Sequence, residues 1–140
     1  MARAPLEALR NTPLFAPLDE RELDRLADRF QERSFREGDT ILEEGEPGTS
    51  FFIILEGNAD VSVGGERKTT LGPGDHFGEM AVLEAGVRSA SVKAATNVRT
   101  CFLTPWEFRP FVEENPHVAW TLLQSVSRRL RDAQRTDGGS

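Results

Sequence analysis

Short apolar runs separated by glycine-containing breaks fill the middle of this 140-residue chain, and they constrain its fold more than any other feature. The runs are Ser34–Phe35, Thr40–Leu42, Phe51–Leu55, Ala59–Val63, Lys68–Leu71, Ser89–Ala94 and Val98–Leu103. Several short strands at this spacing predict an antiparallel β-sandwich or barrel. Because Phe51–Leu55 is apolar throughout, we expect this strand to be buried on both faces.

Helical patterns flank the strand region on both sides. Before it, Asp19 and Glu22 form a capping-box pattern at the start of a helix. The apolar face of that helix recurs at helical spacing through Leu23, Leu26, Ala27 and Phe30. After the strands, Thr104 is placed to cap a helix, and Asn115-Pro116 ends it and begins the last one. The last helix carries an apolar stripe of Ala119, Leu122, Leu123, Val126, Leu130 and Ala133.

We therefore predict a single, mainly β domain over residues 1–140, long enough to bury a substantial core. It divides into an N-terminal helical segment (1–30), a β region (31–104), C-terminal helices (105–134) and a polar, frayed tail (135–140).

Charge and hydropathy exclude several classes of protein. With 17 Lys and Arg against 23 Asp and Glu, the formal net charge is −6, which disfavours direct nucleic-acid binding because such binding needs a basic face. The N-terminus has no continuous apolar run, and no stretch approaches the roughly 20 apolar residues that span a bilayer. We therefore expect a cytoplasmic protein without a membrane segment.

One stretch, Phe77–Ala90, carries a pattern suited to an anionic ligand. Gly78 allows a ligand to approach the main chain closely, and the amides of the following short helix carry partial positive charge. Arg88 adds a planar, permanently charged donor suited to phosphate oxygens. Glu79 repels a phosphate, so its presence predicts a ligand that also offers a hydroxyl donor, as a ribose does.

This stretch resembles the phosphate-binding cassette of the cyclic-nucleotide-binding domain family, which includes bacterial catabolite activator proteins, kinase regulatory subunits and cyclic-nucleotide-gated channels. The family pattern is Phe-Gly-Glu, a small or apolar run, and then Arg-Ser/Thr-Ala. The matching residues are Phe77, Gly78, Glu79, Arg88, Ser89 and Ala90. The resemblance covers residues 9 to 133 and implies an antiparallel β jelly roll with flanking helices.

The resemblance also implies a role for each site residue. The phosphate is expected at Arg88 and at the amides around Met80 and Ala81, and the ribose hydroxyl at Glu79. Further ligand contacts are expected from Gly78, Ser89, Ala90, Val61 and, as a lid over the base, Arg129. A second interpretation of Arg129 is structural: its stem covers the apolar stripe while its head stays in solvent.

The implied function is a regulatory or sensor module. Cyclic AMP is the expected ligand, because no carboxylate dedicated to guanine is visible. Cyclic GMP is also possible, because family members with Ser or Thr at the position of Ser89 accept either nucleotide. In the family, binding draws the cassette inward and repositions the C-terminal helices, and an effector protein or domain reads that movement. The sequence does not identify the effector.

Two other functions are compatible with the chain. It could be an interaction domain that kept the fold without the ligand, with two copies pairing as a homodimer through the last helix. A metal-dependent enzyme of the cupin type is disfavoured, because His76 and His117 are the only histidines and neither has neighbouring ligands at strand spacing. We therefore expect neither a metal nor a catalytic residue.

Overall fold

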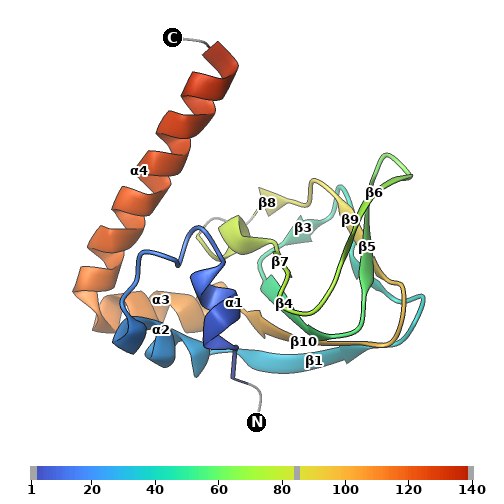
Figure 1. The fold of residues 1–140 in the computed structure, drawn as a ribbon, viewed down its shortest axis with the longest axis horizontal. Coiled ribbons are helices and arrows are strands. Elements are labelled where there is room, and N and C mark those ends of the chain that lie inside the picture. Colours follow the sequence, from blue (N-terminus) through green and yellow to red (C-terminus); the bar gives the residue numbers. More distant parts are fainter. Residues whose placement is uncertain (1–2, 84–85, 139–140) are drawn as a thin grey trace.

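A computed structural model describes residues 3–83 and 86–138 (Figure 1). The helices are α1 (Leu6–Arg10), α2 (Glu20–Ala27), the 3-10 helix η1 (Glu79–Val82), α3 (Pro105–Glu114) and α4 (Pro116–Gly138). The strands are β1 (Gln31–Phe35), β2 (Thr40–Leu42), β3 (Pro47–Gly48), β4 (Phe51–Glu56), β5 (Ala59–Val63), β6 (Glu66–Leu71), β7 (His76–Phe77), β8 (Gly86–Val87), β9 (Ser91–Ala94) and β10 (Val98–Leu103).

Strands β1 to β10 form a β-roll. Over the described residues, two four-stranded sheets have the orders β1-β10-β4-β7 and β2-β9-β5-β6, and β3 pairs with β8. Neighbouring strands run antiparallel in each of these sheets. The predicted fold class, an antiparallel jelly roll with flanking helices, is confirmed.

Strand β4 is buried on both of its faces within its four-stranded sheet. Phe52 and Ile54 point into the core between the two four-stranded sheets, together with Val92. Phe51 and Ile53 point the other way, into the core shared with the helices. This alternation explains why β4 is apolar at successive positions and confirms the prediction of a strand buried on both faces.

The helices pack on the outer face of that sheet. The capping box of α2 forms as predicted: Glu22 N donates to Asp19 Oδ1 at 2.8 Å, and Asp19 N donates to Glu22 Oε1 at 3.0 Å. In α4, Val118 and Leu122 are buried against the same core. The C-terminal half of α4 extends away from the body of the chain (orange to red in Figure 1).

Several element boundaries differ from the sequence prediction. Pro47–Gly48 was expected to be part of a break but forms β3, because Pro47 and Gly48 pair with Val87 and Gly86. The predicted strand Ser89–Ala94 begins only at Ser91, which leaves Arg88–Ala90 as a connection between β8 and β9. Helix α4 continues to Gly138, beyond the predicted end at residue 134, and residues 139–140 of the predicted tail lie outside the described residues.

None of the helices within the described residues is long and apolar enough to cross a membrane.

Candidate functional site

A cavity of about 280 Å³ opens between the second sheet and the segment that follows β7. Its lining combines apolar side chains with main chain and one cation: Leu42, Val61, Phe77, Gly78, Ala81, Gly86, Val87, Arg88, Ser89, Ala90 and Val92. The residues come from β2, β5, β7, η1, β8 and β9, and from the Arg88–Ala90 connection. The fold therefore brings both ends of the predicted cassette to one cavity, although its residues 84 and 85 lie outside the described residues.

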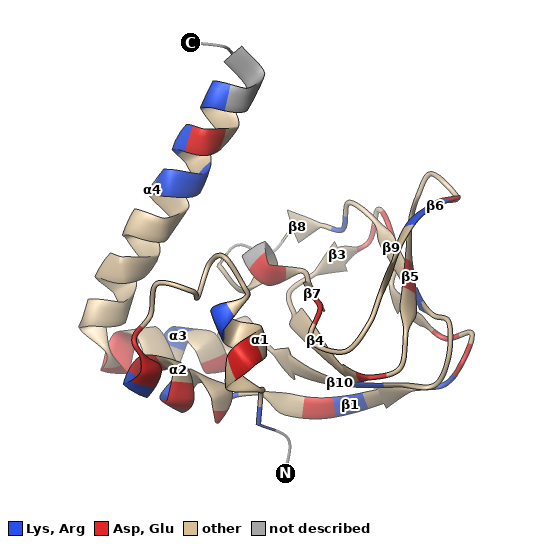
Figure 2. Cartoon of the chain, in the orientation of Figure 1, with Lys and Arg blue, Asp and Glu red and all other residues tan. Residues whose placement is uncertain are grey.

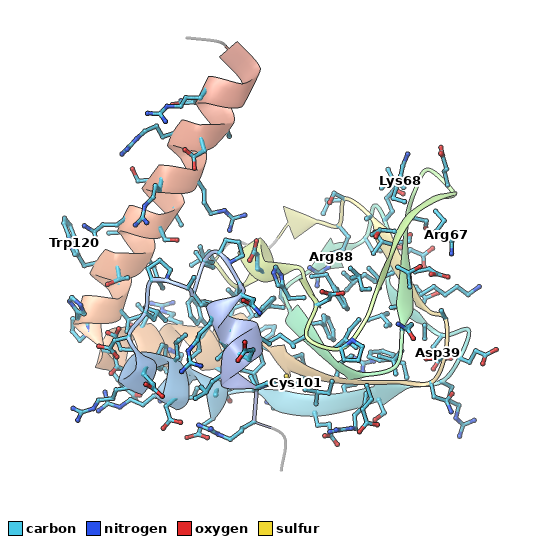
Figure 3. The ribbon with its side chains drawn as sticks, viewed as in Figure 1. Asp39, Arg67, Lys68, Arg88, Cys101 and Trp120 are labelled. Carbon is cyan, nitrogen blue, oxygen red and sulfur yellow. The ribbon has the colours of Figure 1, made fainter. Side chains whose placement is uncertain are left out.

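Arg88 is the cation of this cavity, and the structure holds both its main chain and its side chain (Figure 3). Its N donates to Glu46 O at 2.8 Å, and its O accepts from Gly45 N at 2.9 Å. In the half-buried guanidinium, Nη2 donates to Ser50 O at 2.9 Å. Burial lowers the pKa of Arg88 below its ordinary value, because desolvation disfavours the charged form.

Two glycines make room for this guanidinium. A Cβ at Gly48 would lie 2.0 Å from Arg88 Nε, and a Cβ at Gly78 would lie 2.9 Å from Arg88 Nη1 and 2.8 Å from Ser50 O. Gly78 also has a φ of +79°, which side-chain-bearing residues rarely adopt. The absence of a side chain at these positions therefore fixes where the Arg88 charge sits.

Glu79 does not line the cavity in this structure. Its Oε1 lies 3.0 Å from Arg129 Nη2, so an ion pair joins η1 to α4. The Glu79 side chain is 14% exposed and the Arg129 side chain 37% exposed. Arg129 therefore contacts the carboxylate expected to read the ribose, and neither of its two predicted roles includes this contact.

His76 faces the other oxygen of the same carboxylate. Its Nδ1 lies 3.9 Å from Glu79 Oε2, which is too far for a hydrogen bond. Among the side chains that the structure describes, these two atoms are buried without a hydrogen-bond partner. A buried acceptor and a buried ring nitrogen thus face each other beside the cavity, and neither is satisfied.

Most of the other predicted site residues line the cavity. Gly78, Ala81, Ser89, Ala90 and Val61 line the cavity together with Arg88. The Ala81 amide, expected to hold phosphate, donates to Gly78 O at 3.1 Å within the turn. The side chain of Met80 lies outside the described residues.

Sequence reasoning missed Gly48 and Ser50, which hold the Arg88 side chain. The one sequence signal that could have pointed to them was the glycine-containing break at Gly45–Gly48, which lies between two predicted strands. Its pairing with Gly86–Val87 depends on residues about 40 positions away, and no local pattern encodes such a pairing.

The described residues contain no group of three or more His, Cys, Asp or Glu side chains that could hold a metal ion.

Comparison with known proteins gives a consistent result. The family model described as "Cyclic nucleotide-binding domain" matches residues 32–115. The chain is 32% identical to the cyclic AMP receptor protein of Thermus thermophilus over 130 residues, which make up 89% of this chain and 60% of that protein. It is 36% identical to a cAMP-dependent protein kinase regulatory subunit of Colletotrichum orbiculare over 97 residues, 68% of this chain and 25% of the subunit.

A solved structure has a similar fold. The N-terminal domain of a transcriptional regulator from Streptomyces coelicolor superposes with a TM-score of 0.82 at 31% identity, covering 90% of this chain and 94% of that one. The chain spans less than two thirds of the length of the two curated relatives it matches above.

Proposed function

Because this chain belongs to the cyclic nucleotide-binding domain family, we propose that it is a regulatory module that binds cyclic AMP and transmits binding to its C-terminal helices. The proposal assigns no catalytic residue to the chain. The module passes its signal to an effector protein or domain. The full-length relatives do not identify that effector.

The observation that carries the proposal is the state of Arg88. Its guanidinium is half-buried at the cavity, desolvated, and bonded to the neutral carbonyl of Ser50. Within the described residues, none of the ion pairs includes Arg88. A partly buried cation without a carboxylate partner is strongly stabilised by an incoming anion, and its planar donors match a phosphodiester.

The rest of the cavity lining favours a nucleotide as the anionic ligand. Apolar side chains of β2, β5 and β9, including Leu42, Val61 and Val92, provide a wall for a base. The cavity volume of about 280 Å³ lies just below the range of about 300–1,000 Å³ that is usual for small-molecule sites. Ser89 is exposed and lacks the methyl of threonine, so its hydroxyl oxygen is poorly preorganised to accept a hydrogen bond from a guanine amino group. Cyclic AMP is therefore the preferred ligand, and cyclic GMP a weaker one.

The ion pair between Glu79 and Arg129 supports coupling to α4. A ribose hydroxyl that bonds Glu79 competes with Arg129 for the same carboxylate. Ligand binding then changes how α4 is held against η1. The two arrangements of α4 must differ in ligand affinity for this coupling to operate.

Calorimetric titration with cyclic AMP and cyclic GMP tests the proposal. We expect cyclic AMP to bind more tightly, and Arg88→Ala to weaken binding by about 30-fold or more, since loss of one partner of a desolvated charged pair costs about 2–5 kcal/mol. A change below about threefold in a folded variant would show that Arg88 does not hold the phosphate.

A second function, self-association through α4, is favoured by a separate observation. Trp120, Leu123 and Leu130 are 61%, 62% and 59% exposed, and with Ser127 they recur at spacings of 3, 4 and 3 residues along one helix face. Such spacing is typical of a two-stranded coiled-coil seam. Figure 3 shows Trp120 pointing away from the rest of the chain. A monomer at all concentrations in sedimentation experiments would exclude this function.

A further inference from the structure

We propose that His76 is a proton-dependent positioning residue for Glu79, such that protonation of the imidazole lowers the affinity of the cavity for cyclic AMP. This inference rests on the proposed function, because it assumes that Glu79 accepts the ribose hydroxyl.

One carboxylate oxygen of Glu79 is unsatisfied. Oε1 is paired with Arg129 Nη2 at 3.0 Å, whereas Oε2 is buried without a partner. A buried carboxylate oxygen without a donor is unfavourable, so the first proton donor to reach Oε2 is strongly favoured.

Two proton donors can reach Oε2, and one of them is His76. Its Nδ1 is buried, unpartnered and 3.9 Å from Oε2, so a small rotation of either side chain closes the gap. The imidazole ring packs edge-on against Phe51, with ring centroids 5.7 Å apart, which limits where the ring can turn. The other donor is the ribose hydroxyl of the ligand.

Protonation decides between these donors. Histidine is the side chain that ordinarily changes charge between pH 5 and 8, and in its charged form both ring nitrogens are donors. Protonated His76 therefore presents a charged N–H to Oε2 and holds the carboxylate in the arrangement that also binds Arg129. The hydroxyl then gains less from Glu79, and by linkage the ligand and the proton weaken each other's binding.

The groups around His76 come from three elements. Strand β4 presents the uncharged ring of Phe51, η1 presents Glu79, and α4 contributes Arg129 through its pair with Glu79. Arginine stays charged across this pH range, so Arg129 adds a constant field. The sequence has one other histidine, His117, which is exposed at the start of α4.

The test is a calorimetric titration with cyclic AMP at about pH 5.5 and about pH 8, on either side of the ordinary histidine range. We expect the wild-type affinity to be weaker at the acidic pH by about fivefold or more, the size of a modest coupling. In His76→Asn, and in His76→Gln if the first variant does not fold, the difference should disappear, because an amide gains no charge. His117→Asn is the matched control and should keep the wild-type difference.

Equal wild-type affinities, tighter binding at the acidic pH, or loss of the difference in His117→Asn would each overturn the inference while leaving cyclic-nucleotide binding intact. If cyclic AMP does not bind at either pH, the proposed function fails instead. The interaction between His76 and Glu79 can then be tested in the protein without ligand, by following the NMR signals of the His76 ring over the same pH range. The Glu79→Gln substitution should change these signals and leave those of His117 unchanged. Unchanged His76 signals would exclude the pair.

Discussion

At the scale of single residues, the position of the Arg88 charge is set by residues that carry no charge. Gly48 and Gly78 leave the space that the guanidinium fills, and Ser50 supplies the carbonyl that orients it. The cation is therefore held in place before a ligand arrives. Preorganisation of this kind raises affinity by reducing the entropy lost on binding.

This arrangement predicts that Gly48→Ala weakens cyclic AMP binding although it adds only a methyl group. The new Cβ would lie 2.0 Å from Arg88 Nε, so the guanidinium must move away from the position it occupies beside Gly48. We expect a loss of about tenfold or more in calorimetric titrations, equivalent to about 1.4 kcal/mol. Gly72→Ala is the control, because its Cβ meets only the Asn58 amide at 3.2 Å. Similar losses in both variants would contradict this account.

A second residue-scale prediction concerns Glu79. A carboxylate beside an anion site is useful only if it reads a hydroxyl, so Glu79→Gln should weaken cyclic AMP more than its 2′-deoxy analogue. We expect a difference of about fivefold between the two losses, equivalent to about 1 kcal/mol, which is the net contribution of a typical hydrogen bond. Competition binding measures both ligands under one condition. Equal losses would show that Glu79 serves the pair with Arg129 alone.

At the scale of elements, the ion pair between Glu79 and Arg129 links η1 to the projecting half of α4. The N-terminal half of α4 is anchored by Val118 and Leu122, and by a hydrogen bond that Ser125 Oγ donates to Pro13 O at 3.2 Å. Beyond these contacts, Glu79 gives the helix a point of attachment to the cassette. The pair is therefore placed to control where the far end of α4 lies.

We predict that Arg129→Gln broadens the range of positions sampled by the end of α4. Spin labels at Thr69 in β6 and Gln134 in α4, both exposed, report the distance between the two elements. The distance distribution should widen in Arg129→Gln and stay narrow in Arg128→Gln, since Arg128 is the exposed neighbour outside the pair. An unchanged distribution in Arg129→Gln would show that other contacts hold the helix.

The elements also show what local sequence can and cannot predict. The α2 cap and the continuous apolar run of β4 are encoded within a few residues, and the structure has both as predicted. The two-residue strands β3 and β8 were missed, because each exists only through its partner far along the chain. The orientation of Glu79 was missed for the same reason: the competing partner, Arg129, lies 50 positions away.

At the scale of the whole molecule, charge is unevenly distributed. The chain is acidic overall, yet basic residues gather on the C-terminal half of α4 (blue in Figure 2). They are Arg128, Arg129, Arg131 and Arg135. One of them, Arg129, pairs with the cassette, and the apolar stripe of Trp120, Leu123 and Leu130 occupies an exposed face of the same helix. The helix thus combines the link to the ligand site with the surface proposed for self-association.

These two properties predict that ligand binding and self-association are linked. If cyclic AMP alters the Glu79–Arg129 pair, it changes the position of α4 and therefore the strength of pairing through the stripe. By reciprocity, ligand affinity must then differ between dimer and monomer, and the affinity ratios of the two sites of the dimer multiply to the same factor. Sedimentation velocity with and without cyclic AMP should show the dimer dissociation constant changing by about fivefold or more.

Three variants separate the parts of this prediction. Leu123→Glu places a charge on the apolar stripe and should give a monomer that still binds cyclic AMP, whereas Arg128→Glu places the same acid beside the stripe and should dimerise. Arg129→Gln should dimerise with an affinity that cyclic AMP no longer changes, because the connection between α4 and the cassette is lost. A ligand effect that persists in Arg129→Gln would mean that the signal reaches α4 by another route, such as the packing of η1 on α3.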